Sequence, residues 1–304
     1  MYNNSIKGVG MKKYLSFLIL VLVLNFNCSA FAGDISKEIL EEIEIAFSNK
    51  DYNKVIQTTN KIIKIDSTNS YLYKARAMAN EQLCSETKCN YQSIIDDFSK
   101  AIKYDNHISD NNTSYLYMGR AHARFEIKEY ENAIADYSIA INLNDFTNSE
   151  WSTLLFFQRA EARLKIEDYS GAIVDYTRVI KLNKRNDNFF KMISYIHRGN
   201  AYLEINEYKK AIKDATKAIK IDENCLSAYF LRGRAKAISL KSRNYNTTYD
   251  VMYNIKICES ARQDFNIAKE YSLLQNDMES YKEILDAQKS VDEMIEIQRK
   301  FLNY

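Results

Sequence analysis

The sequence predicts an all-α fold of about six stacked helix pairs, and three observations support this prediction. The chain has 304 residues with no proline and only 7 glycines, so it lacks the turn residues that separate the strands of β-rich folds. One pattern of apolar residues occurs in four copies that are 39 residues apart, and a second pattern occurs upstream of each copy. Both patterns space apolar residues three and four positions apart, which is the spacing of one helix face.

The first 32 residues have the composition of a secretory signal peptide. Lys12 and Lys13 supply positive charge, residues 14–24 form an almost unbroken apolar run, and residues 30–32 provide the small side chains of a cleavage site. The apolar run of 11 residues is shorter than the roughly 20 that a membrane-spanning helix needs, so we expect cleavage rather than anchoring. The expected location is the periplasm or the extracellular medium.

Two alternatives concern this segment. Cys28 is a candidate lipid-bearing N-terminus, although Asn27 before it is larger than the small residue typical of a lipobox. Translation could also start at Met11.

Without residues 1–32 the chain keeps 40 acidic residues and 39 of its 42 basic residues, a net charge of about −1. This near-neutral charge gives no support to nucleic-acid binding.

The second helix of each pair is predicted from the 39-residue pattern. Its best copy reads Tyr130-x-x-Ala133-Ile134-x-Asp136-Tyr137. This spacing describes a helix that buries one face. The tyrosines that open the four copies are Tyr91, Tyr130, Tyr169 and Tyr208.

The first helix of each pair is predicted from the string aromatic-x-x-Arg-Ala/Gly-x-Ala. A small residue at a fixed place in both helices lets the two backbones approach closely, and the aromatic ring fills the space beside it. The aromatic residues that open the five copies are Tyr73, Tyr117, Phe156, Tyr195 and Tyr229.

This two-helix unit resembles the tetratricopeptide repeat over about residues 36–270. The resemblance implies a right-handed superhelical solenoid that binds a protein or peptide, without a cofactor and without catalysis. The chain departs from the family in having no proline after the second helix, and in a period of 39 rather than 34 residues. We interpret the additional residues as an extra turn at the start of the first helix.

The expected boundaries follow from these patterns. Residues 276–304 are predicted to form an amphipathic helix that caps the last pair, or alternatively lies in the ligand groove. Residues 241–257 are predicted to be an insertion in the last unit. The solenoid is predicted over residues 33–275, with units at 36–69, 70–113, 114–152, 153–191, 192–225 and 226–275.

The sequence contains no pattern typical of catalysis. Histidine occurs only at His107, His122 and His197, and none has the local spacing of a metal site. There is no Gly-rich phosphate loop and no nucleophile elbow. We therefore expect no enzymatic activity, no metal and no cofactor.

The aspartates of the second-helix pattern are interpreted as structural. An active site is needed once, whereas a structural pair is needed in every repeat. We expect surface ion pairs with arginines of the first helix, worth about 0–1 kcal/mol each. The predicted pairs are Arg120 with Asp136, Arg159 with Asp175, and Arg198 with Asp214.

The cysteines are predicted to form one disulfide. Cys84 and Cys89 lie in a predicted loop that can bring them together in an oxidising compartment. Their four intervening residues differ from the two of a thioredoxin-like pair. Cys225 and Cys258 are expected at opposite ends of a helix hairpin, about 20 Å apart, and therefore as buried thiols.

The resemblance also implies a ligand groove lined by the first helices. Its central part would be apolar and would bind a helix or an extended segment through side chains. Alternatively, the longer first helices bury these residues against neighbouring units, or the C-terminal helix covers them. The functional alternatives are a structural component that self-associates through the solenoid ends and a secreted factor that engages a host protein. The implied groove residues are Tyr71, Tyr115, Met118, Leu154, Phe157, Ile193, Ile196, Asn200 and Phe230.

Overall fold

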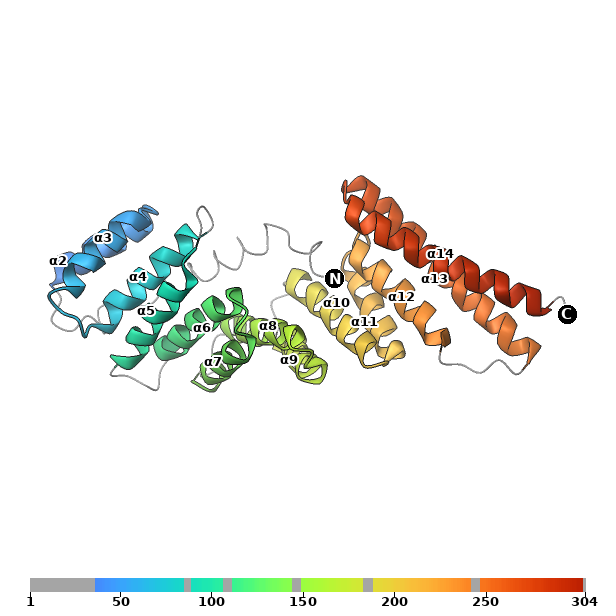
Figure 1. The fold of residues 1–304 in the computed structure, drawn as a ribbon, viewed down its shortest axis with the longest axis horizontal. Coiled ribbons are helices and arrows are strands. Elements are labelled where there is room, and N and C mark those ends of the chain that lie inside the picture. The colour runs from blue at the N-terminus through green and yellow to red at the C-terminus, as the bar shows by residue number, and fades with distance from the viewer. Residues whose placement is uncertain are drawn as a thin grey trace. The chain divides into compact units, whose positions relative to one another are not determined.

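The computed structural model describes residues 36–84, 89–105, 111–143, 149–182, 188–241 and 247–302. Within these ranges every regular element is an α-helix (Figure 1). The helices are α2 (Lys37–Ser48), α3 (Tyr52–Ile63), α4 (Ser70–Leu83), α5 (Tyr91–Lys103), α6 (Asn111–Glu126), α7 (Tyr130–Leu143), α8 (Ser149–Lys165), α9 (Tyr169–Leu182), α10 (Asn188–Glu204), α11 (Tyr208–Ile221), α12 (Leu226–Lys241), α13 (Thr248–Leu274) and α14 (Met278–Leu302).

The helices divide into two compact units, with α2 to α8 in the N-terminal unit and α9 to α14 in the C-terminal unit. In the N-terminal unit each helix packs on the next, and the first helices α6 and α8 also touch each other. The same holds in the C-terminal unit, where α10 touches α12 and α12 touches α14. Each unit is therefore a stack of helix pairs, and the prediction of an all-α repeat is confirmed.

A short turn without glycine joins the two helices of a pair. Lys128 and Asn206 occupy the same place in two of these turns, and their φ angles are 69° and 62°. The next residue then donates its backbone N–H five positions back, as Glu129 does to the carbonyl of Arg124 at 2.9 Å. This is the bonding of a Schellman motif, which commonly has glycine at the positive-φ position. The chain thus makes sharp turns although it has only 7 glycines.

The first helices of the central pairs begin earlier than the predicted unit boundaries. α8 and α10 have 17 residues each, against 14 in α4. They begin at Ser149 and Asn188, whereas the predicted units begin at residues 153 and 192. The extra turn is stabilised by packing, because the Trp151 ring stacks on Tyr115 of α6 with centroids 5.7 Å apart. The predicted boundaries therefore cut into helices.

The last helices show what the insertion and the C-terminal segment do. Most of the predicted insertion lengthens α13, because α12 ends at Lys241 and α13 already begins at Thr248. α14 packs on α13 and α12, as the first helix of a further pair would. It buries Ile284, Val291 and Ile295 in one core with those helices. This is the packing expected of a helix that caps the end of a stack.

Candidate functional site

The arginines of the first helices bind the aspartates of the second helices. In the pair of Arg120 and Asp136, Nε donates to Oδ2 and Nη2 to Oδ1, both at 2.8 Å. Arg198 and Asp214 have the same geometry, at 2.7 and 2.9 Å. Both aspartate side chains are at most 4% exposed, so these pairs are buried, unlike the surface pairs that the sequence suggests. Paired charge-assisted hydrogen bonds fix the two helices in a defined geometry. The same contact joins Arg76 to Asp97 and Arg232 to Asp264.

These arginines also bind the preceding repeat, which was not expected from the sequence. Arg120 Nη1 donates to Ser99 Oγ of α5 at 3.2 Å. Arg198 Nη1 donates to Thr177 Oγ1 of α9 at 2.8 Å. Each arginine therefore ties together the second helices of two successive repeats. A sequence signal for this contact exists, since polar acceptors recur every 39 residues at Asn60, Ser99, Ser138 and Thr177.

The remaining predicted pair joins Arg159 to Asp175. Arg159 belongs to the N-terminal unit, where its Nη1 donates to Ser138 Oγ at 3.0 Å. Asp175 belongs to the C-terminal unit. Since the pair spans the two units, it stays a prediction.

The apolar residues of the implied groove are not open to a partner. All eight are at most 7% exposed. The extra helical turn explains part of this burial, because Trp151 covers Tyr115 in the N-terminal unit. In the C-terminal unit Phe230 packs on Phe265, with ring centroids 5.8 Å apart. The expectation that these residues are exposed is therefore wrong, and burial by the longer first helices is the alternative that fits. The buried residues are Tyr71, Tyr115, Met118, Leu154, Phe157, Ile193, Ile196 and Phe230.

A row of polar residues on the first helices remains accessible. These residues lie five positions after the aromatic of the first-helix pattern, and we call them the polar row. They are His122 on α6 and Glu161 on α8 in the N-terminal unit, and Asn200 on α10 and Arg234 on α12 in the C-terminal unit, and all four are half-buried. Asn200 is the one predicted groove residue that belongs to the row. The polar row supplies hydrogen-bonding groups and charges of both signs.

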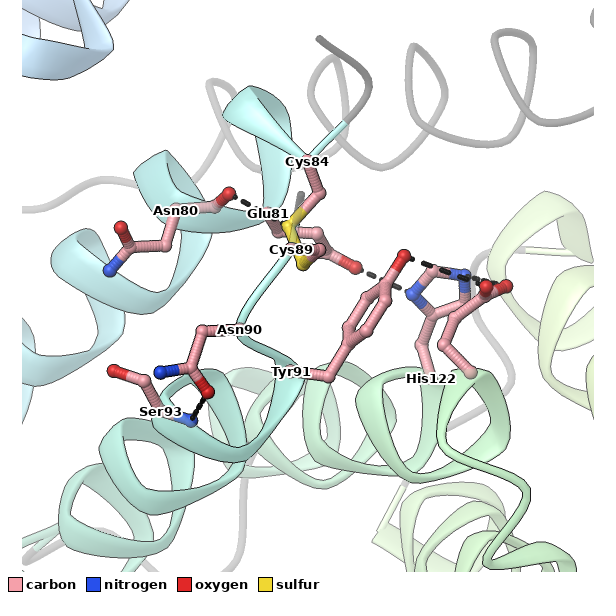
Figure 2. Close-up of a disulfide and its surroundings, with 9 residues drawn as sticks. Asn80, Glu81, Cys84, Cys89, Asn90, Tyr91, Ser93 and His122 are labelled. Atoms are coloured by element: carbon pink, nitrogen blue, oxygen red, sulfur yellow. Dashed lines mark hydrogen bonds and ion pairs between the residues drawn. A yellow bond between two sulfur atoms is a disulfide. The ribbon is translucent and has the colours of Figure 1, made fainter. Parts of the chain in front are cut away.

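A second group of charged side chains meets the polar row where α4, α5 and α6 come together (Figure 2). His122 Nδ1 lies 2.6 Å from Glu81 Oε1, which belongs to the last turn of α4. On the other side of the ring, His122 Nε2 lies 3.9 Å from Glu126 Oε1. Tyr91, the first residue of α5, donates its hydroxyl to Glu126 Oε2 at 3.5 Å. Three helices from two successive repeats thus meet through four polar side chains.

The tyrosines near this group stay neutral at physiological pH. Burial raises the pKa of Tyr91 to about 12, and the carboxylates of Glu126 and Glu81 add to this effect. Burial, followed by the charge of Glu81, raises the pKa of Tyr115 and of Tyr137 well above the ordinary value. The charge of the group is therefore set by the two carboxylates and the imidazole.

A disulfide lies beside the same group. Cys84 and Cys89 are bonded, with Cα atoms 4.7 Å apart, and link the end of α4 to the start of α5 (Figure 2). Cys84 follows Glu81 by about one helical turn, and Cys89 precedes Tyr91 by two residues. The disulfide therefore connects the two helix ends that supply Glu81 and Tyr91.

Removing this disulfide is expected to lower the free energy of unfolding by about 2 kcal/mol, because a bond that closes a short loop removes about that much chain entropy from the unfolded state. Urea unfolding of the Cys84→Ser/Cys89→Ser variant measures the effect. Dithiothreitol should shift the wild-type curve by the same amount and leave the variant unchanged. A wild-type curve that the reductant does not move would show that the bond adds no stability.

The two remaining cysteines of the predicted mature chain, Cys225 and Cys258, are free thiols. Burial raises the pKa of Cys225 above its usual value and that of Cys258 to about 11. Cys258 is fully buried, as the sequence predicts, whereas Cys225 is only half-buried. Neither thiol has the lowered pKa of a reactive cysteine.

Neither a metal site nor a membrane-spanning helix is found in the part of the chain that the structure describes. No three His, Cys, Asp or Glu side chains in these ranges are arranged to hold a metal ion. No helix among the described residues is long and apolar enough to cross a membrane.

Comparison with known proteins gives a family match for one repeat and a fold for most of the chain. The family model described as Tetratricopeptide repeat matches residues 193–225, which include most of α10 and all of α11. The crystal structure of YrrB, a TPR protein with an unusual peptide-binding site, is 16% identical and has a TM-score of 0.54 over 76% of this chain and 97% of YrrB. The crystal structure of the MamA protein is 20% identical and has a TM-score of 0.50 over 67% of this chain and 91% of MamA. No curated protein sequence matches the chain.

The family model and the internal repetition lead to one assignment. The matched residues contain Arg198 and Asp214, the buried pair that recurs in other helix pairs of this chain. Residues 193–225 therefore match the tetratricopeptide repeat family, and the likeness to YrrB and MamA shows the same fold over most of the chain.

Proposed function

We propose that this protein is a non-catalytic scaffold that binds another protein or a peptide on the face of its first helices, through the polar row. Within each unit the stacked helix pairs present the same helix face more than once, and such a surface suits an extended partner. YrrB, which is similar in fold, is described as having a peptide-binding site, and this supports the proposal.

The observation that carries the proposal is the contrast between two rows on the first helices. The apolar side chains of Phe157 and Ile196 are at most 2% exposed. Asn200 and Arg234, in the polar row, are half-buried and keep access to solvent. The buried apolar residues fix the helices, so the polar side chains that these helices carry are held in position before a partner binds. This lowers the entropy cost of binding. A partner is therefore recognised by hydrogen bonds and charges that differ from repeat to repeat.

We place this function outside the cytoplasm, in the periplasm or the secreted fraction. The signal-like segment at residues 1–32 supports export. The disulfide between Cys84 and Cys89 is of a kind that persists in oxidising compartments. The partner is then an envelope protein or a host protein.

A second candidate function, self-association through the solenoid ends, is favoured by exposed apolar side chains near both ends of the described chain. Ile45 on α2 is 60% exposed. Leu274 and Met278, at the turn from α13 to α14, are 79% and 58% exposed. Contacts between unlike ends of two copies would build a chain of molecules rather than a closed dimer.

A photo-crosslinking amino acid at Asn200 is expected to trap a partner protein, whereas the same amino acid at Lys209 is expected to trap none. Asn200 belongs to the polar row, and Lys209 is an exposed residue on the second helix of the same repeat. Irradiation of cells that express each variant, followed by mass spectrometry of the adducts, identifies what is trapped.

Two other outcomes would contradict parts of this proposal. Equal adducts from Asn200 and Lys209 would exclude the polar row as the binding surface. Adducts between two copies of this chain, formed from Met278 and not from Asn200, would favour self-association. Sedimentation of the purified protein then measures the size of the assembly.

A further inference from the structure

We infer that the outer side of α11 binds the surface of a membrane that contains anionic lipids, through a row of lysines. The lysines lie on a second helix, whereas the polar row lies on the first helices, so this binding does not depend on the proposed partner. α11 belongs to the C-terminal unit, which holds every residue of the row. The residues of the row, which we call the lysine row, are Lys209, Lys213, Lys217 and Lys220.

The lysine row covers the side of α11 that faces away from the core. Because an α-helix has about 3.6 residues per turn, the four side chains lie within about 80° around the helix axis. The residues that α11 buries lie on the opposite side. Lys209, Lys213 and Lys220 are exposed, and Lys217 is half-buried. The row is therefore accessible over about 16 Å of the helix, from its first turn to its last.

The helices that form this surface expose no carboxylate of their own. Among the residues of α11 and of the preceding second helix α9, the carboxylates are those of Asp214 and Asp175, which are 3% and 0% exposed. α9 adds two exposed basic residues of the same unit, Arg178 and Lys181. The exposed charge of both helices is therefore positive.

The carboxylates nearest in sequence lie at the ends of α11. Glu207 precedes the helix, and its Oε1 lies 3.2 Å from Nζ of Lys210, a lysine outside the row. Asp222 follows the helix and accepts the backbone N–H of Asn224 at 2.9 Å. Glu223 is exposed one residue further on. These groups limit the row at both ends and leave the side of the helix positive.

The lysine row is not explained by the stability of the helix. Lys209 lies in the first turn of α11, where a positive charge opposes the helix dipole. Lys209, Lys213 and Lys217 follow one another at intervals of four residues, and like charges at this spacing destabilise a helix. Local unfavourable choices of this kind are typical of functional sites.

The other copies of the 39-residue pattern separate the lysines that recur from those that do not. Lys217 corresponds to Lys100 of α5, and their Nζ atoms lie 5.0 Å and 5.2 Å from the ring centroids of Tyr195 and Tyr73. The first two lysines of the row have no basic counterpart in the other three copies, as expected of a binding surface rather than of the fold. At the position of Lys209 these copies have Gln92, Glu131 and Ser170, and at that of Lys213 they have Asp96, Ala135 and Val174.

Lipid headgroups match the lysine row better than an acidic protein does. The lysine side chain is a flexible point charge, which suits phosphates that can move in the plane of a membrane. A protein with fixed carboxylates would favour arginine, whose planar group binds them in a defined geometry. Basic clusters on one side of an amphipathic helix are typical of proteins that bind anionic lipids.

Lipid headgroups also match the lysine row better than a nucleic acid does. A site for nucleic acid usually adds aromatic rings on which bases stack. Here the neighbouring ring of Tyr195 already has Lys217 over it. Val174 of α9, which is 58% exposed, instead offers an apolar side chain that the headgroup region of a membrane accepts.

Binding through the lysine row is peripheral and reversible. The buried side of α11 packs on α10 and α12, so the helix has no free apolar side to insert into a bilayer. The attraction then depends on charge, and each lysine near an anionic membrane strengthens binding about fivefold. Salt weakens it, because raising the salt concentration from about 0.01 M to about 1 M shortens the Debye length from about 30 Å to about 3 Å.

Sedimentation with lipid vesicles tests this binding. The purified full chain is mixed at low salt with vesicles of phosphatidylcholine, alone or with an equal part of phosphatidylglycerol, and the bound fraction gives a partition coefficient. In Lys209→Gln/Lys213→Gln/Lys220→Gln, binding to the anionic vesicles should fall about a hundredfold, the product of three fivefold effects. Binding to the neutral vesicles should not change, and it measures any contribution of the apolar run at residues 14–24.

The matched control removes the same charge from three exposed lysines of α14, in the same unit. Because α14 also exposes Asp286, Glu293 and Glu296, this variant should bind the anionic vesicles as the wild type does. Equal losses in both triple variants would show that net charge rather than the lysine row attracts the protein. That result, or a wild type without preference for anionic vesicles, would overturn the inference. The control variant is Lys282→Gln/Lys289→Gln/Lys300→Gln.

A second variant keeps the test decisive if the first glutamine variant does not fold. Lys209→Arg/Lys213→Arg/Lys220→Arg keeps the charge of the row. It should bind anionic vesicles as the wild type does at low salt and lose them at high salt. Weak binding at low salt by this variant, with its helical circular dichroism intact, would contradict attraction by charge and overturn the inference.

Two further results would assign the lysine row to a different partner. Tighter binding to duplex DNA than to anionic vesicles at the same phosphate concentration, lost in the glutamine variant of α11, would favour a nucleic acid. A membrane surface leaves the photo-crosslinking amino acid at Lys209 without a protein adduct. A protein trapped at that position would favour an acidic protein surface, and either result would overturn the assignment to lipids.

Discussion

Replacing Asp214 by alanine is expected to lower the free energy of unfolding by about 3–5 kcal/mol, because it leaves a buried arginine without its counter-charge. Arg198 is 10% exposed and makes two hydrogen bonds to Asp214, at 2.7 and 2.9 Å. Burial acts to lower the pKa of Arg198, but the hydrogen bonds and charge of Asp214 outweigh it and raise the pKa above the usual value. Removing Asp214 takes this effect away, but the guanidinium still stays charged because the ordinary pKa of arginine lies far above neutral pH.

Two further variants make the interpretation of this experiment unambiguous. Arg198→Met in the Asp214→Ala background should recover part of the lost stability, since no charge then remains buried. Glu259→Ala removes the partner of Arg299 in a surface pair whose side chains are 43% and 59% exposed, and should change stability by about 0–1 kcal/mol. Urea unfolding followed by circular dichroism measures all three. Equal losses from Asp214→Ala and Glu259→Ala would show that the repeated aspartates are ordinary surface charges.

The sequence was sufficient to predict the repeat because each repeat carries its own copy of the same local pattern. The 39-residue recurrence of apolar and small residues fixes the helix type and the pairing of helices. The aspartate of the second helix and the arginine of the first recur with it, so their pairing was also predictable. Their burial was not, because it depends on how the preceding repeat packs against them. The contact of Arg120 with Ser99 shows this packing.

The solvent exposure of the residues on the first-helix face could not be predicted from the sequence. Residues such as Phe157 and Ile193 occupy positions that the family resemblance assigns to a ligand groove, yet they are at most 2% exposed. Part of the difference arises from the additional helical turn of α8, whose packing is non-local. Trp151 stacks on Tyr115, which lies 36 residues earlier in the chain. No local pattern contains that contact, so a polar row could not be distinguished from an apolar groove.

Some of the turns were also beyond the sequence patterns, although Asn206 and Asn276 carry the usual signal. Glycine or asparagine is the usual signal for a helix that ends in the left-handed region. Here Lys50, Lys128 and Glu167 take φ angles of 57°, 69° and 61°. Their side chains carry no turn preference, so the surrounding helix packing holds the backbone in this conformation.

Replacing Phe98 by alanine is the second change with a large expected effect, a loss of about 3–5 kcal/mol in the free energy of unfolding. Phe98 on α5 is 0% exposed, and its ring lies against Gly119 of α6, the first helix of the next repeat. A Cβ atom at Gly119 would lie within 2.7 Å of Phe98 Cε1, closer than van der Waals contact allows. The ring therefore fills the space that the small residue leaves, and truncating it leaves a cavity between two repeats.

The packing of Phe98 against Gly119 can be tested by substitutions at either residue. Gly119→Ala alone should cost about 1–3 kcal/mol, because the added methyl group overpacks the contact. In the Phe98→Leu background the same change should cost less, since the smaller side chain leaves room, and the double-mutant cycle measures the coupling. Tyr249→Ala, which truncates an aromatic side chain that is 77% exposed, should stay within about 0.5 kcal/mol of the wild type. Additive losses at positions 98 and 119 would mean that the aromatic ring and the small residue do not depend on each other. In that case the close approach of α5 and α6 would need another explanation than their complementary shapes.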